Sequence, residues 1–260
     1  MTKTEPSAKP AGGARIVARE VLGAAWPLFQ VCLPRCLPLA LIAIGTGAMR
    51  ASEAGHAGGN PAHGGEWWGV MLASTVLMLI CYGAMLRQQL RLAAGERAPL
   101  MQSLSDAVRD VPAVLVIAAA WILPLLPAMA STAWRGFDGV ALVLALAAAA
   151  LLVFLIPAWP AMTARNLLPW VALQESIRLV RGRWLQFAGL VMILLLGLAV
   201  FVLIAGIFLG MVMYLAGQGA NPTPTALAAS RWLMAIVLAV PVVYVGAVSV
   251  VLWRTATAVR

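Results

Sequence analysis

The chain has 260 residues, of which 63% are hydrophobic and 10% are charged, and its formal net charge is +9. Soluble domains carry about 25% charged residues, so this composition excludes an ordinary soluble protein and indicates that a lipid bilayer surrounds most of the chain. In a soluble protein the positive charge would suggest nucleic acid as a partner. Here the placement of the basic residues offers a membrane explanation, and we expect no nucleic acid partner.

Six apolar stretches follow a polar N-terminal segment. Residues 1–14 are polar and contain Pro and Gly, which predicts a disordered cytosolic tail. Each later stretch approaches or exceeds the roughly 20 residues that a transmembrane helix needs, and none alternates as a strand would. The stretches are 33–49, 67–86, 112–130, 139–163, 187–216 and 232–253. The predicted fold class is all-α: a polytopic membrane protein whose residues 15–260 form a single domain with six transmembrane helices.

The basic residues lie mostly on one side of these spans. Of the 18 Lys and Arg residues, only Arg50, Arg135 and Arg231 fall on the segments of one side. Short loops rich in Lys and Arg stay in the cytosol, so both termini are predicted to be cytosolic. Most basic residues are Arg rather than Lys, a bias that we attribute to a GC-rich bacterial genome. The predicted location is therefore a bacterial inner membrane.

An amphipathic segment precedes the first, third and fifth spans. Its apolar residues have the spacing 0, 4, 7, 11, which is one stripe of a helix. The three stripes are Val17, Val21, Ala24 and Leu28; Leu100, Leu104, Ala107 and Val111; and Leu173, Ile177, Val180 and Trp184. The opposite faces carry arginines, and helices of this kind lie in the plane of the membrane interface. The predicted lipid-interface residues are Arg19, Arg109, Arg178, Arg181 and Arg183.

Each amphipathic segment with the two spans that follow it forms a unit, and the three units resemble one another. They cover about residues 15–90, 98–168 and 170–254, and the second span of each ends in a basic residue, namely Arg87, Arg165 and Arg254. Such a pattern indicates a threefold pseudo-repeat. The alternative is that any helical hairpin returning to the cytosolic face looks like this.

The third unit carries a sequence motif with a known counterpart. Residues 156–190 contain the pattern A…S..L..G.W at Ala172, Ser176, Leu179, Gly182 and Trp184. The segment resembles a group of mostly uncharacterised bacterial six-helix inner-membrane proteins, which are related to the membrane domain fused to some glycerophosphodiester phosphodiesterases. This resemblance implies a six-helix architecture and no activity, because the phosphodiesterase chemistry of the fused proteins belongs to a separate soluble barrel.

The sequence offers little catalytic chemistry. Spans two to six have no Asp, Glu, Lys, Arg or His in their central portions, which disfavours proton-coupled transport because a coupled transporter needs such groups at depth. No carboxylate pair, nucleophile motif or phosphate-binding glycine loop appears. We therefore predict no catalytic residue and no cofactor, and a protein that is not an enzyme.

The segment 51–69 contains both histidines, His56 and His63, with two carboxylates nearby. Imidazole and carboxylate are ligands for zinc or copper, so a metal site is one hypothesis. The segment is also rich in glycine and matches no known ligand spacing, and a flexible periplasmic loop is the other hypothesis.

Two functions fit these observations. The first is a non-enzymatic accessory or scaffold protein. Through its interfacial helices it would engage membrane lipids, including anionic lipids, or a protein partner. The second is an uncoupled transporter or channel component for a small amphiphile.

The fifth span also holds Gly206 and Gly210, a GxxxG pair that lets helices approach closely. It suits packing within one chain or the seam of a homo-oligomer.

Overall fold

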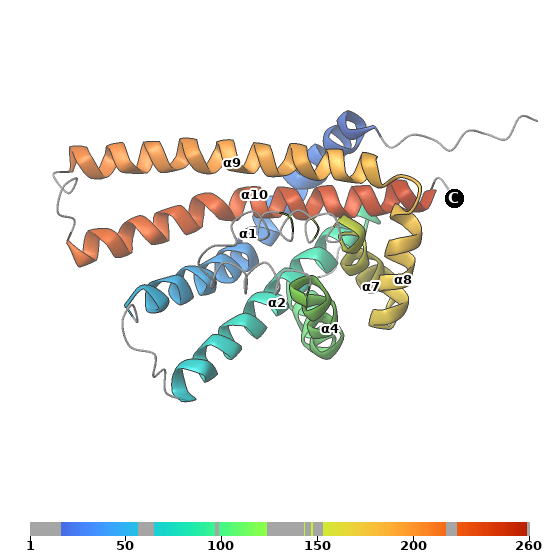
Figure 1. The fold of residues 1–260 in the computed structure, drawn as a ribbon, viewed down its shortest axis with the longest axis horizontal. Helices are drawn as coiled ribbons and strands as arrows, with labels where there is room; N and C mark the ends of the chain where they lie inside the picture. The colour runs from blue at the N-terminus through green and yellow to red at the C-terminus, as the bar shows by residue number, and fades with distance from the viewer. Residues whose placement is uncertain are drawn as a thin grey trace, which may run out of the picture.

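The computed structural model describes residues 17–56, 65–96, 99–123, 143, 147, 153–216 and 223–258. Within these ranges all regular structure is helical, which confirms the all-α prediction for the part described (Figure 1). The helices are α1 (Ala18–His56), α2 (Gly65–Ala93), α3 (Leu100–Arg109), α4 (Val111–Ile122), α7 (Ala158–Arg165), α8 (Pro169–Val180), α9 (Trp184–Leu215) and α10 (Pro224–Ala258).

Four of these helices are long and apolar enough to cross a membrane. They are α1 over Ala18–Thr46, α2 over Gly69–Ala93, α9 over its whole length, and α10 from Thr225 onward. This set fits an integral membrane protein. The predicted third and fourth spans lie partly outside the described residues, and so does the whole of the predicted N-terminal tail.

The first amphipathic segment and the first predicted span form one continuous helix, α1, of 39 residues. Three prolines, at positions 27, 34 and 38, lie inside this helix and all are exposed. A proline removes a backbone donor, but on the exposed face it leaves the packed face intact. The buried positions include Val21, Ala25, Cys32 and Cys36. Of the predicted stripe, Val21 is buried and Val17 and Ala24 are exposed.

The core lies where α1 and α2 pack against α10. The Phe29 ring meets the Tyr244 ring edge-on at 5.5 Å between centroids, and the Tyr244 hydroxyl donates to the Leu22 carbonyl at 3.3 Å. Near this level α2 and α10 touch through Gly246, where an added Cβ would lie 2.6 Å from Gln89 Oε1. Only a glycine permits so close an approach, and Gln89 Nε2 donates to the Val243 carbonyl at 2.9 Å.

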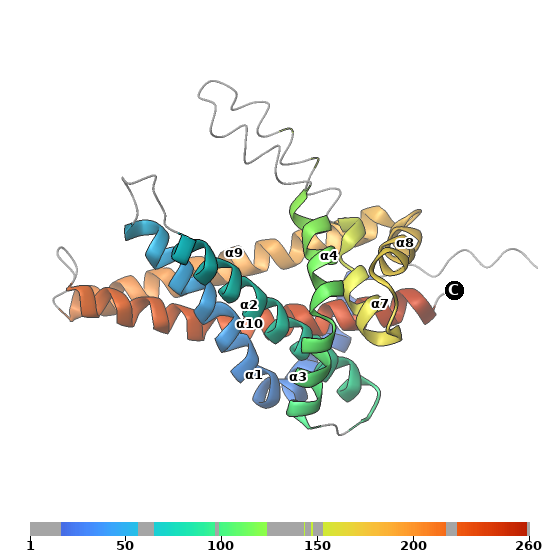
Figure 2. The same ribbon diagram turned by 90° about the horizontal axis from the view of Figure 1, so that it is seen from below.

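The short helices α3, α4 and α7 pack against α2, and α8 packs against α7 and α4. Pro112 lies in the first turn of α4, where its missing N–H costs nothing, and Asp110 separates α4 from α3. Figure 2 shows α4 running across the direction of α9 and α10 rather than along it. On α3, Ala107 of the predicted stripe is buried and Leu100 and Leu104 are half-buried, so much of this stripe packs on the protein.

Helix α8 packs on the protein mainly through residues outside its predicted apolar stripe, and the membrane-interface role of that stripe stays a prediction. Ile177 is 45% exposed and Trp184 is 43% exposed, whereas the buried face carries Ala172, Ser176 and Leu179. The Ser176 hydroxyl donates to the Phe154 carbonyl at 2.5 Å. Small residues let α8 lie close to the segment before α7, so packing here selects small side chains and leaves larger apolar ones outside.

Helix α9 lies along the outside of the molecule and packs chiefly on α10 (Figure 1). Most of its large apolar side chains are exposed, and the buried ones, Phe187 and Leu190, belong to its first two turns. A helix that is apolar on all sides is stable when lipid or protein surrounds it. The exposed length of α9 therefore fits a surface that lipid or another protein covers.

Candidate functional site

The C-terminal half of α2 carries a cluster of paired charges. Arg87 forms an ion pair with Asp110, and its Nη1 lies 3.6 Å from Asp106 Oδ2. Arg91 Nη2 lies 2.7 Å from the same Asp106 oxygen. The Arg87 side chain is only 12% exposed. Breaking such a pair leaves an uncompensated charge, so these arginines hold α3 and α4 against α2.

Buried amide and hydroxyl groups extend this cluster inward. The Ser103 hydroxyl donates to Gln88 Oε1 at 2.8 Å and accepts from Arg91 Nη1 at 3.2 Å. Ser103 and Gln88 are both buried, and buried polar groups are stable only when they are bonded in this way. The cluster therefore acts as a specific connection between α2 and α3.

Two further arginines, Arg165 and Arg254, also bind other parts of the protein. Arg165 Nη1 lies 2.7 Å from Glu175 Oε1, and the guanidinium lies 5.8 Å from the centre of the Trp253 ring. Arg254 Nη1 donates to the Ala93 carbonyl at the end of α2. The three residues predicted to close the repeat units, Arg87, Arg165 and Arg254, thus all bind other parts of the protein.

The predicted lipid-interface arginines differ from these. Arg19, Arg109, Arg178 and Arg181 are exposed and Arg183 is half-buried. Within the described ranges none of the five forms an ion pair. The structure places them on three elements: Arg19 begins α1, Arg109 ends α3, and the other three gather where α8 meets α9.

The α8–α9 connection is a type II turn. The Arg183 N–H donates to the Val180 carbonyl at 2.9 Å, and Arg181 has φ −56° and ψ 122°. Gly182 follows with φ +89°, which the third position of this turn requires and which glycine adopts without strain. Gly182 therefore holds the two arginines on either side of a tight turn at the start of α9.

A groove opens beside this turn among α2, α7, α9 and α10. Its volume is about 510 Å³, and we call it the four-helix groove. Representative lining residues are Tyr82, Leu86, Trp159, Trp184, Val248 and Ser249. The Ser249 hydroxyl donates to the Gly246 carbonyl of its own helix, so the groove presents mainly hydrocarbon. Such lining suits an apolar chain rather than a polar solute.

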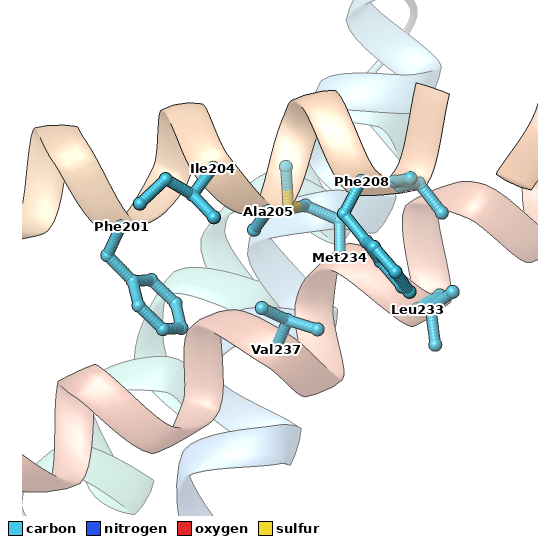
Figure 3. A pocket seen from close by; sticks show the side chains of 8 residues that line it. Phe201, Ile204, Ala205, Phe208, Leu233, Met234 and Val237 are labelled. Carbon is cyan, nitrogen blue, oxygen red and sulfur yellow. The ribbon is translucent and has the colours of Figure 1, made fainter. Parts of the chain in front are cut away.

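A second, smaller groove of about 270 Å³ lies between α9 and α10 (Figure 3). Phe201, Phe208 and Val237 are among its apolar walls. The GxxxG pair of α9 makes no close helix contact there, because a Cβ on Gly206 would meet only the Met234 methyl at 3.9 Å. A Cβ on Gly210 would meet nothing within 4 Å. Close packing through the pair within one chain is therefore not found in the described structure.

The metal hypothesis concerns residues that the structure covers only in part. His56 is the last residue of α1, and His63 lies outside the described residues. The described part of the chain holds no group of three or more His, Cys, Asp or Glu side chains arranged for a metal ion. The external histidine site stays a prediction.

No protein-family model, no curated protein and no solved structure matches this chain. The resemblance to six-helix inner-membrane proteins therefore stays a prediction. The structure does give its motif physical roles: Ala172, Ser176 and Leu179 form the buried face of α8, Gly182 makes the turn, and Trp184 lines the four-helix groove.

The paired cluster was missed at the sequence level, although a signal was present. Arg87 and Arg91 are four residues apart, and so are Asp106 and Asp110. Residues at this spacing share one face of a helix, so two arginines on one helix can form ion pairs with two aspartates on a neighbouring helix. The groove had no comparable signal, because its walls come from four separate helices.

Proposed function

We propose that the protein is a non-enzymatic accessory or scaffold protein of the bacterial inner membrane that engages anionic lipid through its short arginine-bearing helices. In this proposal the chain crosses the membrane six times and both termini are cytosolic. Helices α3 and α8, with the first turns of α1, then lie at the inner leaflet. Anionic headgroups there attract basic side chains, at about 1 kcal/mol for each residue near the surface.

One observation carries the proposal, and it concerns the surface around the α8–α9 turn. Exposed arginines without ion-pair partners in the described structure lie beside exposed apolar side chains: Ile177 on α8, and Leu185, which is 70% exposed, on α9. Basic and large apolar groups side by side are typical of a helix seated at a lipid interface. A helix facing only water would leave those apolar groups in an unfavourable environment.

The alternative, an uncoupled path for a small amphiphile, would require polar groups along a route through the helices. The two grooves have chiefly hydrocarbon walls. They favour contact with lipid chains over passage of a polar solute, so we do not propose transport.

The test measures which lipids gather around the protein in a bilayer. The full chain, carrying a fluorescent donor, is reconstituted into phosphatidylcholine vesicles that contain a minority of acceptor-labelled phosphatidylglycerol. Energy transfer above that from acceptor-labelled phosphatidylcholine reports enrichment of the anionic lipid. The Arg178→Glu, Arg181→Glu double variant should reduce the enrichment about tenfold, given two reversed interfacial charges.

The matched control is Arg231→Glu, which changes an exposed arginine at the start of α10, on the predicted opposite side of the membrane. This control should retain the enrichment of the wild type. The same energy transfer in the wild type and the double variant would contradict the proposed function.

A further inference from the structure

Each of the four walls of the four-helix groove is followed or preceded by an arginine. On α2, Arg87 follows the lining residue Leu86, and on α10, Arg254 lies two residues beyond Leu252. On α7, Arg165 lies five residues beyond Pro160. On α9, Arg183 directly precedes Trp184. Each of the four helices that line the apolar groove thus has an arginine within five residues of a lining residue in the sequence.

Three of these arginines already have acceptors in the protein. Arg87 pairs with Asp106 and Asp110, Arg165 pairs with Glu175, and Arg254 donates to the Ala93 carbonyl. Arg183 differs, because the described structure gives it no ion pair although it is half-buried. A half-buried arginine with no anion beside it has an unmatched positive charge, so Arg183 is the arginine of these four that an external anion would pair with.

The start of α9 strengthens the attraction at this point. The first amide groups of a helix lack acceptors within the helix, and the helix dipole adds positive potential there. Arg181 is exposed two residues earlier, across the Gly182 turn. An anion between Arg181 and Arg183 would therefore lie at the mouth of an apolar groove.

We propose that the four-helix groove holds a single anionic phospholipid, with its phosphate at Arg181 and Arg183 and one acyl chain among the groove residues. The groove volume of about 510 Å³ falls within the roughly 300–1,000 Å³ of small-molecule sites. A free anion would leave the hydrocarbon walls unfilled. A zwitterionic lipid such as phosphatidylcholine would bring its own ammonium group close to the two arginines, and this positive charge opposes the binding of its phosphate. The inference rests on the proposed function, because it needs the α8–α9 turn at the level of the headgroups.

The test uses native mass spectrometry of the full chain in mild detergent, after addition of phosphatidylglycerol or phosphatidylcholine with identical acyl chains. The wild type should retain one phosphatidylglycerol per chain, with a preference of about tenfold over phosphatidylcholine. Arg183→Gln should remove that preference. Absence of a retained lipid, or equal retention of the two lipids by the wild type, would overturn the inference.

Substitutions that fill the groove with a larger side chain distinguish a lipid bound in the groove from lipid that contacts the protein surface in general. Ala188 lines the groove on α9, and Ala188→Phe should lower retention of the single lipid at least about tenfold by steric exclusion. Ala199→Phe is the matched control, because Ala199 is exposed on the same helix and does not line the groove. Ser249→Leu fills the groove from α10, so a folding defect in one variant leaves the other informative. Unchanged retention in both filled variants would also overturn the inference.

The two proposals fail differently in these experiments. If the proposed function is wrong, the wild type shows no enrichment of phosphatidylglycerol in the vesicle bilayer. If only the groove inference is wrong, that enrichment persists in Ala188→Phe and Ser249→Leu, and no lipid is retained in a groove-dependent manner.

Discussion

The arginines at the end of α2 and those at the α8–α9 turn have opposite roles, although both belong to the predicted cytosolic set. Arg87 and Arg91 are largely buried and paired with Asp106 and Asp110. Arg178 and Arg181 are exposed and have no ion pair within the described structure. The comparison teaches that a basic residue of this set serves the fold when an acceptor on a neighbouring helix reaches it, and otherwise stays at the surface.

The number of carboxylates near each group of arginines explains why one group is paired and the other is not. Asp106 and Asp110 are one helical turn apart on the side of α3 and α4 that faces α2. Helix α8 has a single carboxylate, Glu175, and this group pairs with Arg165 of α7. The arginines of the α8–α9 turn are therefore left without an acid on their own helix.

The largest expected effect comes from breaking the paired region. Arg87→Ala leaves Asp110 without its partner in a mostly buried place and should destabilise the protein by about 3 kcal/mol. Thermal unfolding in mild detergent measures this as a lower Tm. Arg109→Ala, at the end of α3, is the matched control and should leave the Tm nearly unchanged. Equal Tm values for the two variants would remove the distinction between paired and exposed arginines.

A smaller effect is expected from the hydroxyl that joins α2 to α3. Ser103→Ala removes the donor to Gln88 and the acceptor for Arg91, at about 1–2 kcal/mol for a buried polar contact. Ser105→Ala changes an exposed serine two residues along the same helix and should have almost no effect. A Tm for Ser103→Ala that matches the Ser105→Ala value would show that the hydroxyl is dispensable.

The smallest effect concerns the turn that holds the unpaired arginines. Gly182→Ala places a side chain at φ +89°, which costs about 1 kcal/mol in the left-handed region. The Tm should fall by about 2–4 °C for a chain of this size. Gly189→Ala is the control, because its added Cβ meets nothing within 4 Å. If Gly182→Ala raises the Tm above that of the control, the turn does not require a residue that tolerates positive φ at position 182.

The long apolar helices were the most predictable part of the fold. The spans predicted at 67–86, 187–216 and 232–253 correspond to α2, α9 and α10, because a run of apolar residues this long has few alternatives to a helix. The continuity of α1 was not predictable from its three prolines, since only the fold shows that they share the exposed face.

The candidate site was predictable only in part. The arginines of the α8–α9 turn were identified from their density on one face of a predicted helix, and the structure leaves them exposed or half-buried. The face that α8 packs on the protein was not predictable from hydropathy, because it carries the small residues Ala172 and Ser176 whereas Ile177 of the apolar stripe is exposed. The four-helix groove could not be found from local patterns at all.

The sequence by itself determined the helical class, the long apolar helices and the concentration of arginines in certain segments. These properties depend on composition and on periodicity along the chain, which neighbours cannot change. Only the tertiary structure decided which arginines are paired, which face of each short helix is buried, and where a groove remains. Those outcomes depend on residues distant in sequence, such as Arg87 with Asp110, meeting at distances of a few ångströms.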